Sequence, residues 1–241
     1  MPFTFVHPAI ILPLNKLPRW FSMTGLLIGS LVPDFEYFLR MNIQSEYSHT
    51  LAGLFWFNLP LSILIAFIFH NIVKIKLINN LPKFLQYRFQ NYNSFLWNQY
   101  FKKNWLKITV SILIGAFLHL LWDSFTHISG YFVEQFPLLK NEVLILKYHI
   151  PIFKILQHGS TILGGLFILF FIYKMPKIST TYKNIEIKYW LIFVFFMLLI
   201  IVVKMCFGLK IQQYGNFIVT FISAAIISLI ISSLFTSKQN L

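Results

Sequence analysis

The sequence predicts an all-α, polytopic integral membrane protein, a helical bundle of about five to six spans with a broken first segment. Its 241 residues are 57% hydrophobic and only 11% charged, and the mean hydropathy of +0.70 is too high for an average soluble domain. Polar residues gather in short patches between apolar runs, without the alternation of a transmembrane barrel. Because a membrane segment must satisfy its own backbone hydrogen bonds, each run is expected to form a helix.

The apolar runs differ in length. Residues 9–14 and 20–32 are each too short to cross about 30 Å of hydrocarbon, because a polar stretch at 16–19 separates them. This first element is either one span preceded by a surface helix or a hairpin that dips into the membrane. The other runs cover residues 51–70, 108–125, 160–173, 189–203 and 217–235, with connections over 71–107 and 126–158. We expect 1–175 to form a membrane domain with the candidate site, and 176–241 to form two scaffold helices.

The charge distribution indicates lipid partners and an orientation. The formal net charge is +13, but the basic residues are scattered through the loops and form no motif that reads nucleic acid. Anionic lipid headgroups are therefore the expected partner, and nucleic acid is not. If the spans alternate, one side collects 14 basic residues and the other collects 6, which predicts that the first side is cytoplasmic. Cys206 is the only cysteine, so the sequence excludes an intramolecular disulfide and a thiolate metal site.

An ionisable stripe marks the central helix. His119, Asp123 and His127 recur every four residues within an otherwise apolar segment, so they share one helix face. A histidine and a carboxylate four residues apart can both reach one divalent cation, for the geometric reason that two histidines do so in zinc-binding helices. The alternative is that His119 and Asp123 hydrogen-bond to each other or to a neighbouring helix. This helix alone leaves both possibilities open.

Ionisable residues of other segments fall on the same side of the predicted membrane. Asp34 and Glu36, two of only seven acidic residues, lie just beyond the second apolar run. His49 follows an N-cap serine at the start of the third run, and His158 precedes a later one. With alternating spans, these residues share the less basic, non-cytoplasmic side with Asp123. Their convergence favours a metal site over plain solvated helix ends.

Five stretches of the sequence together resemble one family. They are Met1–Pro8, Pro33–Tyr37, Ser48–Gly53, His119–His127 and Leu156–Thr161. Over nearly the whole chain they resemble the uncharacterised bacterial membrane family described as domain of unknown function 4184. This resemblance implies a multi-pass protein of the bacterial inner membrane, and it includes His127 and His158 among the shared positions.

A more distant resemblance concerns the order of the motifs. A histidine, Pro-Asp-x-acid, Ser/Thr-His and then His-x-x-x-Asp resemble the membrane-bound metal-dependent hydrolases, a group akin to the zinc-dependent phospholipase C and nuclease fold. That motif maps onto His7, Asp34, Glu36, His49, His119 and Asp123. The chain departs from it where Glu36 replaces an aspartate, and where Glu46–Ser48 replaces a His-Arg-Gly run.

The resulting hypothesis is a metal-dependent hydrolase that acts on a lipid or amphiphilic (phospho)ester at the non-cytoplasmic interface. The resemblance implies metal ligands at His7, Asp34, His49, His119 and Asp123. Nitrogen and oxygen ligands without a thiolate suit zinc, with manganese or iron next. Glu36 or Asp34 could be the general base, and His127 or His158 could protonate the leaving group. The alternatives are a transporter that relays protons or an ion, and a structural protein whose polar cluster locks its helices together.

Overall fold

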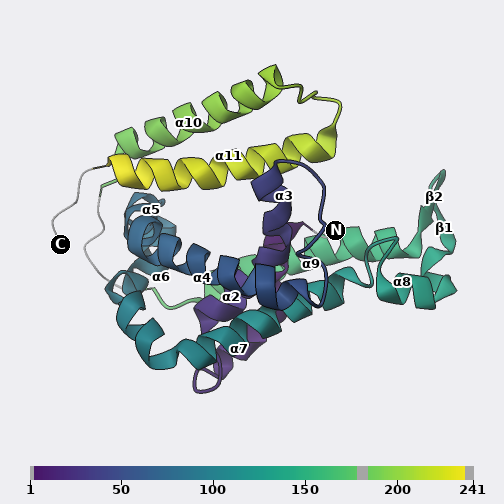
Figure 1. Ribbon diagram of the computed structural model, residues 1–241, viewed down its shortest axis with the longest axis horizontal. Helices are drawn as coiled ribbons and strands as arrows, with labels where there is room; N and C mark the ends of the chain where they lie inside the picture. Colours follow the sequence, from purple (N-terminus) through teal and green to yellow (C-terminus); the bar gives the residue numbers. More distant parts are fainter. Residues whose placement is uncertain (1–2, 178–183, 237–241) are drawn as a thin grey trace. The chain divides into compact units, whose positions relative to one another are not determined.

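The computed structural model describes residues 3–177 and 184–236 (Figure 1). The chain divides into two compact units that alternate along the sequence. The first unit comprises Met1–Asp34, Tyr47–Ser62 and Asn104–Lys174. The second unit comprises Phe35–Glu46, Ile63–Lys103 and Met175–Leu241. The functional division at residue 175 that the sequence suggests stays a prediction.

Helices dominate the described residues, as the composition predicts. Five of them are long and apolar enough to cross a membrane: Leu54–Asn80, Trp97–Asp123 (α7), Ile152–Lys174 (α9), Ile187–Cys206 (α10) and Tyr214–Phe235 (α11). These helices indicate a membrane protein. The structure adds one element that an all-α class leaves out, a small antiparallel hairpin of Glu142–Ile145 (β1) and Tyr148–Pro151 (β2).

The broken first segment is a helical hairpin. Its first arm consists of Thr4–Val6 (η1), Pro8–Ile11 (α1) and Leu12–Lys16 (η2), and its second arm of Met23–Leu31 (α2) and Val32–Asp34 (η3). The arms pack against each other through a buried cluster of Ile11, Leu12 and Leu26. A hydrogen bond joins Thr4, near the start of the first arm, to Asp34, at the end of the second. Of the two arrangements that the sequence left open, the structure therefore has the hairpin.

The prediction of one long connection over residues 71–107 is wrong, because helices occupy most of it. The preceding helix runs on as Leu54–Asn58 (η4), Leu59–Ile68 (α4), Phe69–Val73 (η5) and Lys74–Asn80 (α5). Lys83–Phe89 (α6) and Gln90–Ser94 (η6) follow, and α7 begins at Trp97. Lysine, glutamine and arginine are good helix formers, so a break in apolar character did not mean a break in the helix. Some of the basic side chains have local partners; Lys74, for example, donates to the carbonyl oxygen of Phe95 at 2.6 Å.

The connection after α7 is also more ordered than its composition suggests. It contains Tyr131–Gln135 (α8), Pro137–Lys140 (η7) and the two strands, and α9 begins directly after them at Ile152. Figure 1 shows this hairpin beside the start of α9. In the second unit, Phe35–Arg40 (α3) packs on α11 through Phe38, Val219 and Ile222.

Small residues allow α2 and α7 to approach closely within the first unit. A Cβ atom added to Gly29 would lie 2.3 Å from the carbonyl oxygen of Ile112, and one added to Gly115 would lie 2.5 Å from that of Leu26. Ser111 adds a polar contact, because its Oγ accepts a hydrogen bond from the backbone N–H of Ser22 at 2.8 Å. Small residues spaced by four are typical of tightly packed membrane helices. This packing brings the end of α2 beside the polar stripe of α7.

Candidate metal centre

Four ionisable side chains converge in the first unit. Asp34 comes from η3, His49 from the turn before η4, and His119 and Asp123 from α7. Each offers one possible ligand atom, and the four atoms all lie within 4.8 Å of one another. Asp34, His119 and Asp123 are buried, and His49 is half-buried. The structure thus holds a buried Asp/His cluster that could bind a metal ion.

The distances between the facing nitrogen and oxygen atoms fit a metal site. His119 Nε2 lies 3.5 Å from Asp34 Oδ1 and 3.4 Å from Asp123 Oδ2. His49 Nε2 lies 3.6 Å from each of the same two oxygens. Charge-assisted hydrogen bonds between nitrogen and oxygen are shorter, about 2.7–2.9 Å. A tetrahedron around a cation with bonds of 2.0–2.2 Å has edges of roughly 3.3–3.6 Å, which these distances match.

Three of these buried atoms have no hydrogen-bond partner within the described part of the chain: Asp34 Oδ1, His119 Nε2 and Asp123 Oδ2. Buried polar atoms are normally satisfied, so three unsatisfied atoms facing one point need an explanation. A divalent cation would satisfy all of them together. Two imidazoles and two carboxylates form a donor set that suits zinc.

The second nitrogen of each imidazole is held from outside the cluster. His119 Nδ1 lies 2.7 Å from the carbonyl oxygen of Ser30. A carbonyl oxygen only accepts, so Nδ1 carries a proton, and Nε2, which faces the cluster, would bind a cation once it is deprotonated. His49 Nδ1 lies 3.0 Å from the hydroxyl of Ser48, which can either donate or accept. Both rings are therefore oriented as metal ligands normally are.

The N-terminal segment holds the outer oxygens of both carboxylates. Thr4 Oγ1 donates to Asp34 Oδ2 at 2.5 Å, and His7 Nε2 lies 3.2 Å from Asp123 Oδ1. His7 Nδ1 in turn donates to the carbonyl oxygen of Thr4 at 3.1 Å, and the His7 ring stacks on His119 at 3.8 Å between centroids. His7, assigned as a ligand from the motif, thus lies beside the four converging residues and contacts the outer side of Asp123. Direct ligation by His7 stays a prediction.

The turn that carries His49 is fixed by residues that the sequence did not single out. The Asn58 side-chain amide, buried in the π-helical turn η4, donates to the carbonyl oxygen of Ser48 at 2.8 Å. Gly53 permits the close return of the chain, because a Cβ atom there would lie 1.9 Å from the carbonyl oxygen of Tyr47. π-Helical turns inside α-helices are frequent at functional sites. Neither residue carries a spacing signal, so only the three-dimensional structure reveals their role.

The three residues predicted to be catalytic lie in different settings. Glu36 belongs to the second unit, where its buried carboxylate pairs with Arg40 at 3.0 Å and accepts from the Glu46 backbone N–H at 2.9 Å. His127 Nδ1 donates to the backbone carbonyl of Asp123 at 3.2 Å. His158 is exposed on α9. Of the three, only His127 contacts a residue of the cluster.

The electrostatics of the cluster keep the carboxylate of Asp34 ionised, and without a cation they favour a proton on His49. Burial would raise the pKa of Asp34, but the positive charge of His119 outweighs it and holds that pKa well below its usual range. Burial would lower the pKa of His49, but the facing carboxylates of Asp123 and Asp34 raise it above the ordinary histidine value. For His127, burial prevails and lowers the pKa. Asp34 is therefore ionised at neutral pH, and His127 is neutral.

The comparisons with known proteins place the chain in a family. A family model described as domain of unknown function (DUF4184) matches residues 1–234. The chain belongs to this family. The matched range includes every residue of the cluster and the whole N-terminal segment that contacts it. No match was found among the curated proteins or among the solved structures. For this DUF4184 protein, the argument for a function therefore depends on the geometry of the cluster.

The contact between Thr4 and Asp34 leads to a prediction about metal affinity. Thr4→Val keeps the volume of the side chain but removes the hydroxyl that orients the carboxylate. Loss of such an outer contact typically weakens metal binding by about 10–100-fold. We expect that decrease when zinc competes with a chromophoric chelator for the purified protein. Thr4→Ser restores the hydroxyl and should bind zinc like the wild type; equal affinity in all three proteins would contradict the assignment.

Proposed function

We propose that this DUF4184 protein is a membrane-embedded, metal-dependent hydrolase that acts on a lipid or amphiphilic (phospho)ester at the non-cytoplasmic interface. The observation that carries the proposal is the spacing of 3.4–3.6 Å between the facing nitrogens of His49 and His119 and the facing oxygens of Asp34 and Asp123. These residues would hold the cation, with zinc expected first and manganese or iron next. When bound, a divalent cation supplies Lewis-acid chemistry that polarises an ester oxygen and makes water acidic near neutral pH.

The residues of the chain would provide access and proton transfer. The side chain of His49 is 22% exposed, more than the other three members of the cluster, so a substrate would approach on its side. His127 is 28% exposed, and its Nδ1 is occupied by the Asp123 backbone carbonyl, which leaves Nε2 as a proton acceptor. We assign to His127 the proton transfer that ester hydrolysis requires. The contacts of Glu36 with Arg40 favour a local structural role, and a role of His158 in leaving-group protonation stays a prediction.

A second candidate function is favoured by the number of ligands. Structural zinc sites usually have four protein ligands, whereas catalytic sites keep one position open for water or substrate. The cluster offers four residues from three segments of the first unit. A metal bound there could therefore have a purely structural role, in which it holds η3, the His49 turn and α7 together. The two candidates share the metal and differ in whether the protein turns over a substrate.

The test begins with metal analysis of purified wild-type protein, followed by hydrolysis assays on a panel of phosphoesters and acyl esters. The hydrolase proposal requires turnover that a chelator abolishes and added zinc restores. Bound metal without turnover, together with a lower melting temperature after chelation, would support the structural role instead. Loss of proton-coupled flux in vesicles of an Asp123→Asn variant, without any ester hydrolysis, would favour a transporter.

The side of the membrane is tested independently by cysteine labelling. Lys83 and Lys140 are both exposed, and the distribution of basic residues places them on opposite sides. We introduce single cysteines at these positions in a Cys206→Ala background and treat intact cells with a membrane-impermeant thiol reagent. Only Lys140→Cys should react before the cells are opened, and both should react afterwards. Labelling of Lys83→Cys alone would put the cluster on the cytoplasmic side.

A further inference from the structure

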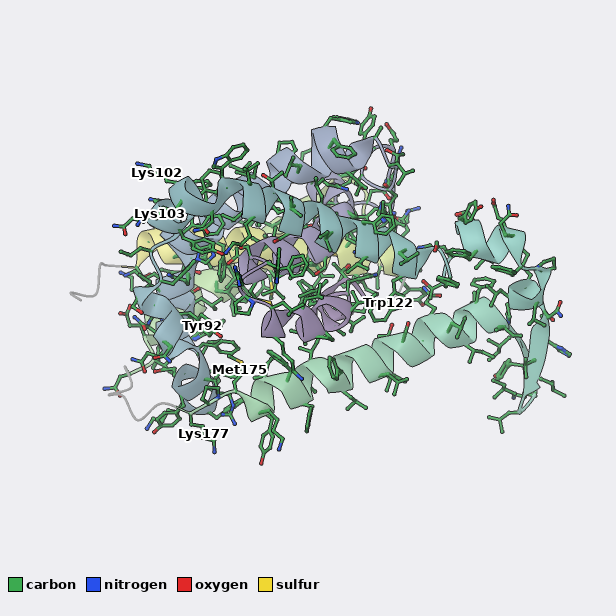
Figure 2. All side chains as sticks on the ribbon, turned by 90° about the horizontal axis from the view of Figure 1, so that it is seen from below. Tyr92, Lys102, Lys103, Trp122, Met175 and Lys177 are labelled. Atoms are coloured by element: carbon green, nitrogen blue, oxygen red, sulfur yellow. The ribbon has the colours of Figure 1, made fainter. Side chains whose placement is uncertain are left out.

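An apolar groove runs along α9 in the first unit. Two adjoining hollows of about 390 and 380 Å³ lie between α9, α1 and the end of α7. Both are lined by Ile10, Trp122 and Ser160, so they form one continuous groove. Figure 2 labels Trp122 on α7, which forms one wall of the groove. Each hollow alone reaches the size of a small-ligand site, which begins at about 300 Å³.

The walls of the groove suit hydrocarbon. Apart from two hydroxyl groups, the lining side chains are apolar, among them Leu121, Phe125, Leu156, Leu163 and Phe167. Both hydroxyls donate to nearby backbone carbonyls: Thr126, in the turn after α7, to Trp122 at 3.3 Å, and Ser160, on α9, to Gln157 at 3.1 Å. Both hydroxyls are therefore occupied, and the rest of the wall is mainly aliphatic and aromatic surface, with the indole N–H of Trp122 as a further polar group. An alkyl chain would bury its methylene groups there.

The length and position of the groove match one acyl chain in one leaflet of the bilayer. The stretch of α9 from Leu156 to Phe167 is about 16 Å long at 1.5 Å per residue, close to half of a hydrocarbon core of about 30 Å. One end of the groove lies at Phe125 and Thr126, and the Thr126 hydroxyl lies 3.4 Å from the carbonyl oxygen of the cluster residue Asp123. Trp122 also packs edge-on against His7, at 5.7 Å between ring centroids. The groove thus begins beside the candidate metal centre and continues along a helix that is itself a candidate span.

We propose that this groove binds one acyl chain of a lipid or of another single-chain amphiphile. The chain lies along α9, and its polar end is held beside Asp123. The groove would then select esters that carry a long alkyl chain, a specificity that rests on the proposed hydrolase function. Binding of the alkyl chain itself does not depend on that function.

The test measures binding to metal-free protein in lipid nanodiscs, so that catalysis does not enter. The probe is a fatty acid that carries a doxyl spin label, which quenches nearby tryptophan fluorescence. The signal from the groove is the saturable quenching that the wild type shows and a Trp122→Phe variant does not. Ser160→Phe places a ring where the two hollows meet, and the half-saturating probe concentration should rise about 10-fold or more because the buried chain contacts are lost.

Ile162→Phe is the matched control, because Ile162 lies on α9, is 63% exposed and is not part of the groove. This variant should bind the probe like the wild type, and both variants should elute as folded protein in size-exclusion chromatography. Equal binding by Ser160→Phe would overturn the proposal, and so would quenching that rises without saturation, as expected for surrounding lipid alone. A dimer in wild type that Ser160→Phe converts to a monomer would show instead that a second copy fills the groove. Saturable binding without hydrolysis of any ester would leave the groove assignment intact and contradict only the hydrolase.

Discussion

Asp123→Asn is expected to abolish metal binding while leaving the protein folded. The amide has the size of the carboxylate and keeps one acceptor oxygen, but it removes one of only two negative charges among the four converging residues. Outer contacts alone alter metal affinity by about 10–100-fold, so loss of a charged ligand should exceed that range. We expect the variant to insert and purify like the wild type, to carry far less zinc by elemental analysis, and to hydrolyse none of the esters that the wild type cleaves.

The matched control is Glu142→Gln, which also replaces a carboxylate with an amide but on the exposed hairpin, where the carboxylate faces His149 at 3.7 Å. It should retain the full metal content. If the cluster were instead a set of ion pairs that locks the helices, the wild type would contain no metal. Removal of one partner of a buried ion pair destabilises a protein by about 3–5 kcal/mol, so Asp123→Asn would then fail to accumulate.

Local periodicity was enough to find the residues of α7. The four-residue spacing of His119 and Asp123 requires only that the segment is helical, and the structure brings both residues into the cluster. Asp34 and His49 could be predicted because they stand at the ends of apolar runs, where alternating spans bring segment ends to one side. These arguments need the order of the segments and no knowledge of how closely the helices pack.

The outer contacts could not be predicted, because they depend on packing between segments that are distant in sequence. The carbonyl oxygen of Ser30 reaches His119 only because α2 and α7 approach through glycine. Thr4 reaches Asp34 only because the first segment folds back as a hairpin. Glu36 is a residue that the sequence did single out but that lies outside the cluster. Its type and position fit a proton acceptor, but Arg40, one helical turn later, pairs with it in the second unit.

The close approach of α2 and α7 predicts that Gly29→Ala will damage the metal centre without changing any ligand. The added Cβ would lie 2.3 Å from the carbonyl oxygen and 2.9 Å from the Cα of Ile112, and no change of rotamer can relieve contacts with backbone atoms. The two helices must therefore separate. The next residue, Ser30, supplies the carbonyl that orients His119 at 2.7 Å, and the same chain continues to Asp34.

We expect Gly29→Ala to lower the stability by about 1–3 kcal/mol, as overpacking of a well-packed core does, and to weaken zinc binding with it. The control is Gly159→Ala, also within a helix, where the added Cβ meets no atom within 4 Å among the described residues. There the higher helix propensity of alanine should raise the stability by roughly 0.5–1 kcal/mol. Thermal unfolding in the same detergent, read with the zinc content of each protein, compares the two changes directly. Because the same substitution is expected to act with opposite sign at the two positions, a stabilising effect at Gly29 would contradict the packing that places Ser30 against His119.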